Sequence, residues 1–369
     1  MPSMSDPHPA DFTPETLIER QGALGRIRLN RPKALNSLTL GMVRDIETAL
    51  DDFEYDPTIT AVLVTGEGER GLCAGGDIRA IHDGGKVGSD APETFWREEY
   101  RLNARIGRYP KPYIAIMDGI VMGGGVGISV YGSHRIVTER TRFAMPETGI
   151  GFFPDVGASW FLTRQDNELG TYIALTGEPL SAADTILAGL ADSFVPSDHL
   201  PVFIKALSDL SSGSSTDAVS AMIAAHSVAP EEGKLAQNRQ AIDRLFAFDT
   251  VEQILEALRE DGGAFARHCL AVLSAKSPLS LTVTLRLLRL GRQSPSLKAC
   301  LEREFAATAA VLASHDFYEG VRAAVIDKDR NPQWRPVRLA DVTENDVAAY
   351  FQPVARPIFA ETSKQGAIP

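Results

Sequence analysis

Three short apolar runs, each four or five residues long, constrain the first half of this chain most strongly. They occupy residues 61–65 (AVLVT), 113–117 (YIAIM) and 135–138 (RIVT). Apolar runs of this length are typical of strands buried on both faces of a parallel sheet. Before the first run, Thr39 can cap a helix, and the apolar residues that follow it recur at helical spacing. Alternating strands and helices predict an α/β domain with mostly parallel pairing.

Two segments rich in small and polar residues divide the chain further. Residues 83–92 (DGGKVGSDAP) are expected to form a flexible loop, and residues 208–217, with five serines, a second loop or linker. Beyond them, helical spacing dominates to about residue 325. The predicted organisation is a disordered arm at 1–13, an α/β core at 14–205, a helical C-terminal region at 206–350 and a tail at 351–369.

Charge and composition exclude several classes of partner. The chain carries 37 basic and 48 acidic side chains, a net charge of −11, which disfavours nucleic acid and anionic membranes. No apolar run is long enough to cross a bilayer, and the first residues (MPSMSDPHPA) resemble neither a secretory signal nor a transit peptide. A cytoplasmic protein without nucleic-acid or membrane partners is therefore expected.

Cysteine and histidine spacing predicts neither disulfides nor a metal site. The odd and scattered set Cys73, Cys269 and Cys300 is expected to consist of buried, reduced thiols. The seven histidines show no metal-binding spacing, and His134 and His315 are expected to be surface or core residues. No metal is predicted.

Glycine is concentrated in two segments that follow predicted strands, at residues 71–78 (GLCAGGDI) and 118–127 (DGIVMGGGVG). The second is expected to open a helix through Ile128, Val130 and Tyr131. One N–H from each segment could form an oxyanion hole for a thioester carbonyl, but two tight turns would explain the spacing equally well. Neither segment has a dinucleotide or phosphate-loop fingerprint.

A third segment, residues 143–157 (FAMPETGIGFFPDVG), places two acids among Gly, Pro, Phe and Met. These are Glu147 and Asp155. Acids in apolar surroundings are costly unless paired, and their pKa values tend to shift. The two could converge on one small substrate, or they could be solvated loop residues or caps. Ser129 does not lie in a GxSxG elbow, which argues against a serine hydrolase.

As a set, these segments resemble the crotonase superfamily. The resemblance is carried by residues 31–36 (RPKALN), 73–77 (CAGGD), 122–125 (MGGG) and 145–147 (MPE), in that order. It implies a spiral of repeated ββα units followed by a mainly helical C-terminal region. It also implies an acyl-CoA substrate, no separate cofactor because CoA is part of that substrate, and a possible homo-oligomer.

Four further stretches resemble one branch of the superfamily, the 3-hydroxyisobutyryl-CoA hydrolases. They are residues 96–103, 145–151 with 153–157, 276–281, and 315–323 with 326–329. This likeness implies hydrolysis of a short-chain acyl-CoA thioester, with 3-hydroxyisobutyryl-CoA of valine breakdown as the expected substrate. An enoyl-CoA hydratase or isomerase is the alternative enzyme, and a silent acyl-CoA-binding protein is the rival from another class.

The resemblance also implies roles for individual residues. Gly76 and Gly124 match the two oxyanion-hole donors, Glu147 the catalytic glutamate and Asp155 the second acid. The residues matched to substrate binding are Glu99, Lys33, Leu35, Ala74 and Asp77. Gly127 stands where enoyl-CoA hydratases carry one of their two glutamates. Since glycine cannot transfer a proton, hydration by two glutamates is not expected.

Overall fold

The strands of the first half form two sheets in the computed structural model, which describes residues 13–165 and 167–359. A six-stranded sheet has the order β1-β2-β3-β5-β7-β9, and a three-stranded sheet has the order β4-β6-β8. Only β1 and β2 pair antiparallel; all other pairs are parallel, as predicted. The strands are β1 Thr16–Gln21, β2 Leu24–Leu29, β3 Ala61–Gly66, β4 Gly71–Cys73, β5 Tyr113–Met117, β6 Ile120–Met122, β7 His134–Val137, β8 Arg142–Ala144 and β9 Ser193–Phe194.

Successive strands alternate between the two sheets. The pairs β3–β4, β5–β6 and β7–β8 each give one strand to the large sheet and the next to the small one. The residues that follow each strand of the small sheet therefore lie in the same region of the molecule as those that follow its neighbouring strands. The predicted α/β spiral is confirmed, and it brings the two glycine segments together.

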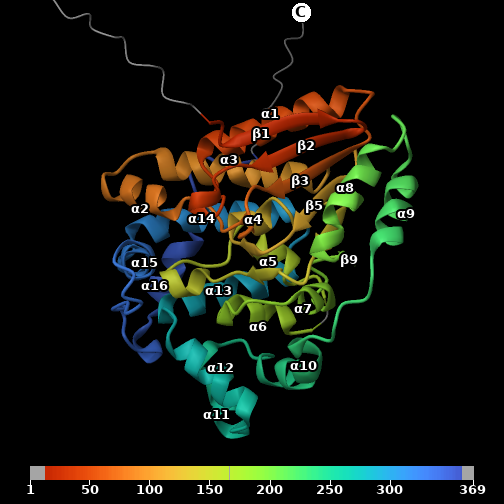
Figure 1. Ribbon diagram of the computed structural model, residues 1–369. Coiled ribbons are helices and arrows are strands. Elements are labelled where there is room, and N and C mark those ends of the chain that lie inside the picture. The colour runs from red at the N-terminus through yellow and green to blue at the C-terminus, as the bar shows by residue number, and fades with distance from the viewer. Residues whose placement is uncertain (1–12, 166, 360–369) are drawn as a thin grey trace, which may run out of the picture.

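The large sheet is covered on both faces. Val62 and Val64 of β3 face the main core, whereas Ala61 and Leu63 face a second apolar cluster, as alternation along a strand requires. That second cluster includes Phe203 and other buried residues of α8 and α9. Figure 1 shows these two helices beside one end of the sheet.

Helices make up most of the remaining chain. Thr39 caps α1 by accepting a hydrogen bond from the Met42 N–H, as predicted. The α-helices are α1 Leu40–Tyr55, α2 Ile78–Lys86, α3 Ala91–Ile106, α4 Gly124–Gly127, α5 Ala158–Phe161, α6 Leu169–Thr176, α7 Ala182–Leu187, α8 Leu200–Ser208, α9 Thr216–His226, α10 Lys234–Leu245, α11 Val251–Asp261, α12 Ala264–Ser274, α13 Pro278–Arg292, α14 Leu297–Ala313, α15 His315–Val321 and α16 Glu344–Ala348. Short segments are η1 Pro32–Ala34, η2 Glu147–Ile150, η3 Ser197–His199, η5 Leu339–Asp341, η6 Ala349–Phe351 and the π-helix η4 Arg322–Ile326.

Two local expectations are wrong. Residues 83–92 are not a loop, because α2 continues to Lys86 and α3 begins at Ala91. The Asp77 side chain caps α2, and Pro92 occupies the first turn of α3, where proline is tolerated. The helix after Gly123 ends at Gly127, and residues 128–131 form turns.

The helical half packs directly against the α/β half. One apolar cluster runs from Ile27 in β2 to Val311 in α14 and Ile358 near the end of the described chain. The expected domain boundary at residue 205 falls inside α8. Residues 1–12 of the expected arm and 360–369 of the expected tail lie outside the described residues. The Ile358 N–H donates to the Glu302 carboxylate, which fixes the preceding part of the tail.

Candidate active site

A small cavity of about 100 Å³ lies where the two glycine segments, α3 and the segment from Pro146 to Asp155 meet. This space is a few times the roughly 30 Å³ that one water molecule occupies in the liquid. It suits a small acyl group. The lining residues are Ala74, Gly75, Gly76, Ile78, Ile81, Phe95, Trp96, Glu99, Met122, Gly123, Gly124, Pro146, Glu147, Ile150, Phe152 and Asp155.

The backbones of the two glycine segments are in contact at this cavity. A Cβ atom on Gly124 would lie 3.1 Å from the backbone nitrogen of Gly76. Leu38 fixes the first segment, because its N–H donates to Gly75 O at 2.8 Å and its carbonyl accepts from the Asp77 N–H at 2.9 Å. Gly124 is the first residue of α4, where backbone N–H groups have no partner within the helix.

Three acidic side chains converge on the same space from different elements. Glu147 begins η2, Asp155 follows in the Phe-Pro-Asp stretch, and Glu99 comes from α3. Their exposed fractions are 6%, 5% and 1%. Two of their carboxyl oxygens, Glu147 Oε2 and Glu99 Oε1, are fully buried and have no hydrogen-bond partner in the described structure. Buried polar atoms of this kind are costly, and at a cavity they are available to a ligand.

Burial changes the acidity of all three groups. Burial and then the charge of Asp155 raise the pKa of Glu147 well above its usual value. Burial, then Asp155 and Glu147, do the same to the pKa of Glu99. Burial raises the pKa of Asp155 to about 7, although a hydrogen bond from Tyr100 opposes the shift. The Tyr100 hydroxyl donates this bond to Asp155 Oδ2 at 2.7 Å.

The remaining wall of the cavity is aromatic and aliphatic. Trp96 of α3 stacks on Phe152 at 5.7 Å between ring centroids. Behind Phe152 lies Phe317 of α15, at 6.2 Å. The backbone of Gly320 lies so close to Ile150 that a side chain at Gly320 would overlap it. The C-terminal helix α15 therefore supports the wall of the cavity and limits its size.

The expected CoA-binding residues are divided between the cavity and its surroundings. Ala74 lines the cavity, whereas Lys33, Leu35 and Asp77 do not. They are nevertheless adjacent, since the Ala74 N–H donates to Leu35 O at 3.0 Å. Asp77 forms an ion pair with Arg31 at 3.0 Å. Lys33 is exposed, and its segment lies beside the first glycine segment.

Gly127 is enclosed by two side chains. A Cβ atom on Gly127 would lie 2.8 Å from Asn103 Nδ2 and 2.9 Å from Val156 Cβ. Both distances are shorter than real Cβ contacts. The space in which a glutamate side chain would begin at this position is therefore already filled.

The helical half holds the segment that follows Asp155. Glu304 of α14 accepts hydrogen bonds from the Gly157 N–H at 2.6 Å and from the Ser159 N–H at 2.9 Å. Val156, between them and Asp155, has φ of 50°, which is strained for a β-branched residue. Tyr131 donates to Val156 O at 2.7 Å. These contacts hold the strained backbone beside the cavity.

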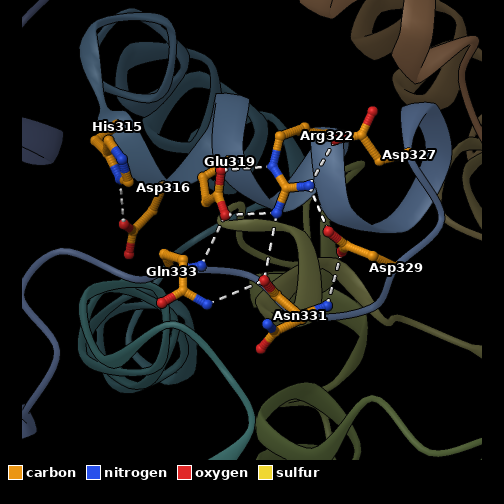
Figure 2. A network of polar contacts seen from close by, with 8 residues as sticks. All are labelled: His315, Asp316, Glu319, Arg322, Asp327, Asp329, Asn331 and Gln333. Atoms are coloured by element: carbon orange, nitrogen blue, oxygen red, sulfur yellow. Dashed lines mark hydrogen bonds and ion pairs between the residues drawn. The ribbon is translucent and has the colours of Figure 1, made fainter.

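The late sequence stretch at 315–329 folds back on itself. Figure 2 shows the guanidinium group of Arg322 between Glu319, Asp327 and Asp329, at 2.8, 2.7 and 2.6 Å. Asp316, in the same view, accepts hydrogen bonds from Ser277 Oγ at 2.6 Å and the Arg335 N–H at 2.7 Å. This network fixes α15, whose Phe317 supports the cavity wall.

Sequence reasoning missed several residues that shape the site. Tyr100 lies in a stretch that was matched only as a block, and Glu304 lies in a helix with no recognisable motif. The three cysteines are free and buried, as expected. Within residues 13–165 and 167–359, no group of three or more His, Cys, Asp or Glu could hold a metal ion. No helix of the described chain is both long enough and apolar enough to cross a membrane.

A two-sheet spiral with acids and paired glycine segments around one small cavity defines an enzyme of the crotonase type. Residues 24–351 match the enoyl-CoA hydratase/isomerase family, and the chain belongs to that family. It is 45% identical over 348 residues to the 3-hydroxyisobutyryl-CoA hydrolase, mitochondrial, of Rattus norvegicus, covering 92% of this chain and 89% of the relative. The protein of the same name from Danio rerio is 46% identical over 341 residues, covering 91% and 89%.

A solved structure shares the whole architecture. A carnitinyl-CoA dehydratase from Mycobacterium thermoresistibile is 46% identical, with a TM-score of 0.89, and the match covers 95% of this chain and 100% of that one. The expected crotonase fold with a helical C-terminal region is thereby confirmed. The chain is an enzyme similar to the 3-hydroxyisobutyryl-CoA hydrolases.

Proposed function

We propose that the chain hydrolyses a short-chain acyl-CoA thioester, with 3-hydroxyisobutyryl-CoA as its substrate and 3-hydroxyisobutyrate and CoA as products. The observation that carries this proposal is the convergence of Glu147, Asp155 and Glu99 with both glycine segments on one cavity of about 100 Å³. The names of the curated relatives support the choice of substrate.

In the proposed reaction, the N–H groups of Gly76 and Gly124 bind the thioester carbonyl oxygen. Negative charge builds on that oxygen when the carbonyl carbon is attacked, and preorganised donors stabilise it. Losing one such donor costs other enzymes roughly 3–4 kcal/mol. The close approach of the two backbones supports this role, because both N–H groups lie in one small region beside the cavity.

Glu147 then acts in one of two ways. It attacks the carbonyl carbon, so that CoA leaves as a thiolate and a mixed anhydride is hydrolysed by water, or it takes a proton from a water molecule that attacks directly. The unpartnered Oε2 of Glu147 supports either role. In a single turnover in ¹⁸O-labelled water, label in Glu147 would identify an anhydride that water opens at the glutamyl carbon. Trapping with hydroxylamine would detect an anhydride that water opens at the acyl carbon, and no label together with no trapped adduct would exclude the anhydride route.

Asp155 orients the water or protonates the departing thiolate. A pKa of about 7 is suited to proton transfer near neutral pH. Glu99, whose raised pKa favours the neutral acid, can hydrogen-bond the 3-hydroxyl group of the acyl chain. No further cofactor is needed because CoA is itself part of the substrate.

Hydration of an enoyl-CoA is the second candidate, and the name of the solved dehydratase favours it. The filled space at Gly127 argues against it, since no second glutamate can be placed there. A panel of acyl-CoA and enoyl-CoA thioesters, followed for free thiol, separates the two. Hydrolysis releases CoA–SH from 3-hydroxyisobutyryl-CoA, whereas loss of an enoyl double bond without free thiol would establish the hydratase.

The cytoplasmic location and the possible homo-oligomer stay predictions. Size-exclusion chromatography with light scattering tests the oligomer. Fractionation of the source cells tests the location.

A further inference from the structure

Lys276 belongs to a late motif, residues 276–281, that the proposed reaction does not use. It lies in the connection between α12 and α13. The next residue fixes this connection to the active site, because the Ser277 N–H donates to Thr148 O at 3.1 Å. Thr148 directly follows Glu147. The Ser277 hydroxyl donates to Asp316 Oδ2 at 2.6 Å, and the Lys276 N–H donates to Leu273 O at 3.1 Å, so the backbone at Lys276 is held from both sides.

The side chain of Lys276 lies in a space that two glycines leave open. Its Nζ is 3.5 Å from the position that a Cβ on Gly149 would take and 3.4 Å from the equivalent position on Gly177. Gly149 is in η2, which begins at Glu147, and Gly177 caps α6. The ammonium group therefore lies between the helical turn of Glu147 and the end of α6.

Two acids, Glu178 and Glu147, act electrostatically on this ammonium group, and they differ in their other partners. Glu178 accepts hydrogen bonds from Tyr172 at 2.9 Å and contacts His268 Nε2 at 2.7 Å. Glu147 has an oxygen without a partner. Burial lowers the pKa of Lys276, while both Glu178 and Glu147 oppose that shift. The ammonium form is thus supported by its acidic neighbours.

Several acidic groups cluster around Glu147 in the described part of the chain. Asp155 and Glu99 line the same cavity as Glu147, and Asp155 in turn acts on the pKa values of Tyr100 of α3 and Glu304 of α14. Burial and Asp155 raise the pKa of Glu147, and Lys276 is the charged side chain that lowers it. Without a cation, a carboxylate in this cluster would hold its proton and could neither attack a carbonyl nor accept a proton.

We propose that Lys276 is a positioning residue of the hydrolase: Ser277 holds its ammonium group against the turn of Glu147, where it favours the ionised, reactive form of that carboxylate. The inference rests on the proposed function. It gives the helical C-terminal region a part in the chemistry in addition to its part in packing.

The test is the pH dependence of thiol release by K276M, K276Q and K276R. In K276M and K276Q the acid limb of kcat moves to higher pH, with a loss of about tenfold or more on that limb and little change in KM. K276R restores the wild-type profile because it keeps the charge. K205M is the matched control, since Lys205 is exposed on α8 and pairs with Asp209.

A uniform loss of activity at all pH values in K276Q, or equal loss in K276R, would overturn the inference. If K276M does not fold, K276Q takes its place in the test, because a glutamine keeps polar atoms in the space that the Lys276 side chain occupies. Direct titration of the Glu147 carboxyl by ¹³C NMR, identified by its absence in E147Q, does not depend on turnover. If the wild type releases no thiol, the proposed function fails; Glu147 titrating alike in wild type and K276Q refutes the role of Lys276 separately.

Discussion

Gly124 and Glu99 meet across the cavity so closely that a methyl group on Gly124 would overlap Glu99 Oε1. The backbone of the second glycine segment therefore lies directly against a side chain of α3. This closeness places a buried acid beside the proposed oxyanion hole, and it makes the site sensitive to a single methyl group.

The variant G124A is expected to lose roughly 10²–10³-fold in kcat, because the methyl group displaces Glu99 or the Gly124 N–H from its place. The loss is measured as thiol release at saturating substrate. G41A is the matched control: its Cβ meets only Thr39 Oγ1, at an ordinary 3.5 Å. G41A should keep full activity, and wild-type activity in G124A would contradict the expectation that the placement of Glu99 and the Gly124 N–H cannot accommodate a methyl group.

Introducing a glutamate at Gly127 is expected not to create a hydratase. The new side chain would collide with Asn103 and Val156, and overpacking of this kind typically costs 1–3 kcal/mol of stability. Thermal unfolding and an enoyl-CoA hydration assay of G127E check both parts. A stable G127E that hydrates enoyl-CoA would show that the space around residue 127 can adapt.

Tyr100 is expected to lower the pKa of Asp155 through its hydrogen bond. In Y100F the donor is lost, so the pKa of Asp155 rises further above 7, and the free energy of unfolding falls by roughly 1–3 kcal/mol because a buried oxygen loses its partner. The pH profile of kcat/KM and urea denaturation measure the two effects. An unchanged profile would mean that Asp155 does not limit the rate.

How far the sequence predicted this site depends on where each residue lies in the chain. Glu147, Asp155 and the glycines lie in short, unusual segments, so local pattern together with family likeness singled them out, and the structure places them around one cavity. Tyr100, Lys276 and Glu304 act through contacts with segments 55, 129 and 147 residues away. No local pattern predicts such pairs, because tertiary packing creates them.

The two wrong local expectations have physical reasons. The Gly and Ser content of residues 83–92 suggested a loop, yet the Asp77 cap and packing against α15 keep α2 helical to Lys86. Tertiary packing often outweighs weak helix propensity. Beyond Gly127, the apolar residues that suggested a helix are buried in turns instead.

The stability of the protein is expected to depend on pH through Asp155. Its pKa is about 7 in the folded protein and 3.8 ordinarily, so its contribution to stability is full below about pH 4 and is lost as pH rises toward 7. D155N lacks this loss. As pH rises from about 4 to 7, its free energy of unfolding should therefore increase by up to roughly 4 kcal/mol relative to that of the wild type. Urea denaturation at several pH values tests this, with D198N as surface control. Parallel curves for D155N and wild type would contradict it.

The most direct test of the account is free thiol released from 3-hydroxyisobutyryl-CoA by the wild type and by E147Q, with CoA binding measured in parallel. We predict rapid release by the wild type, a loss of roughly 10²–10⁴-fold in E147Q and unchanged binding. Near-normal hydrolysis by E147Q would contradict the central claim that Glu147 drives the reaction in this cavity.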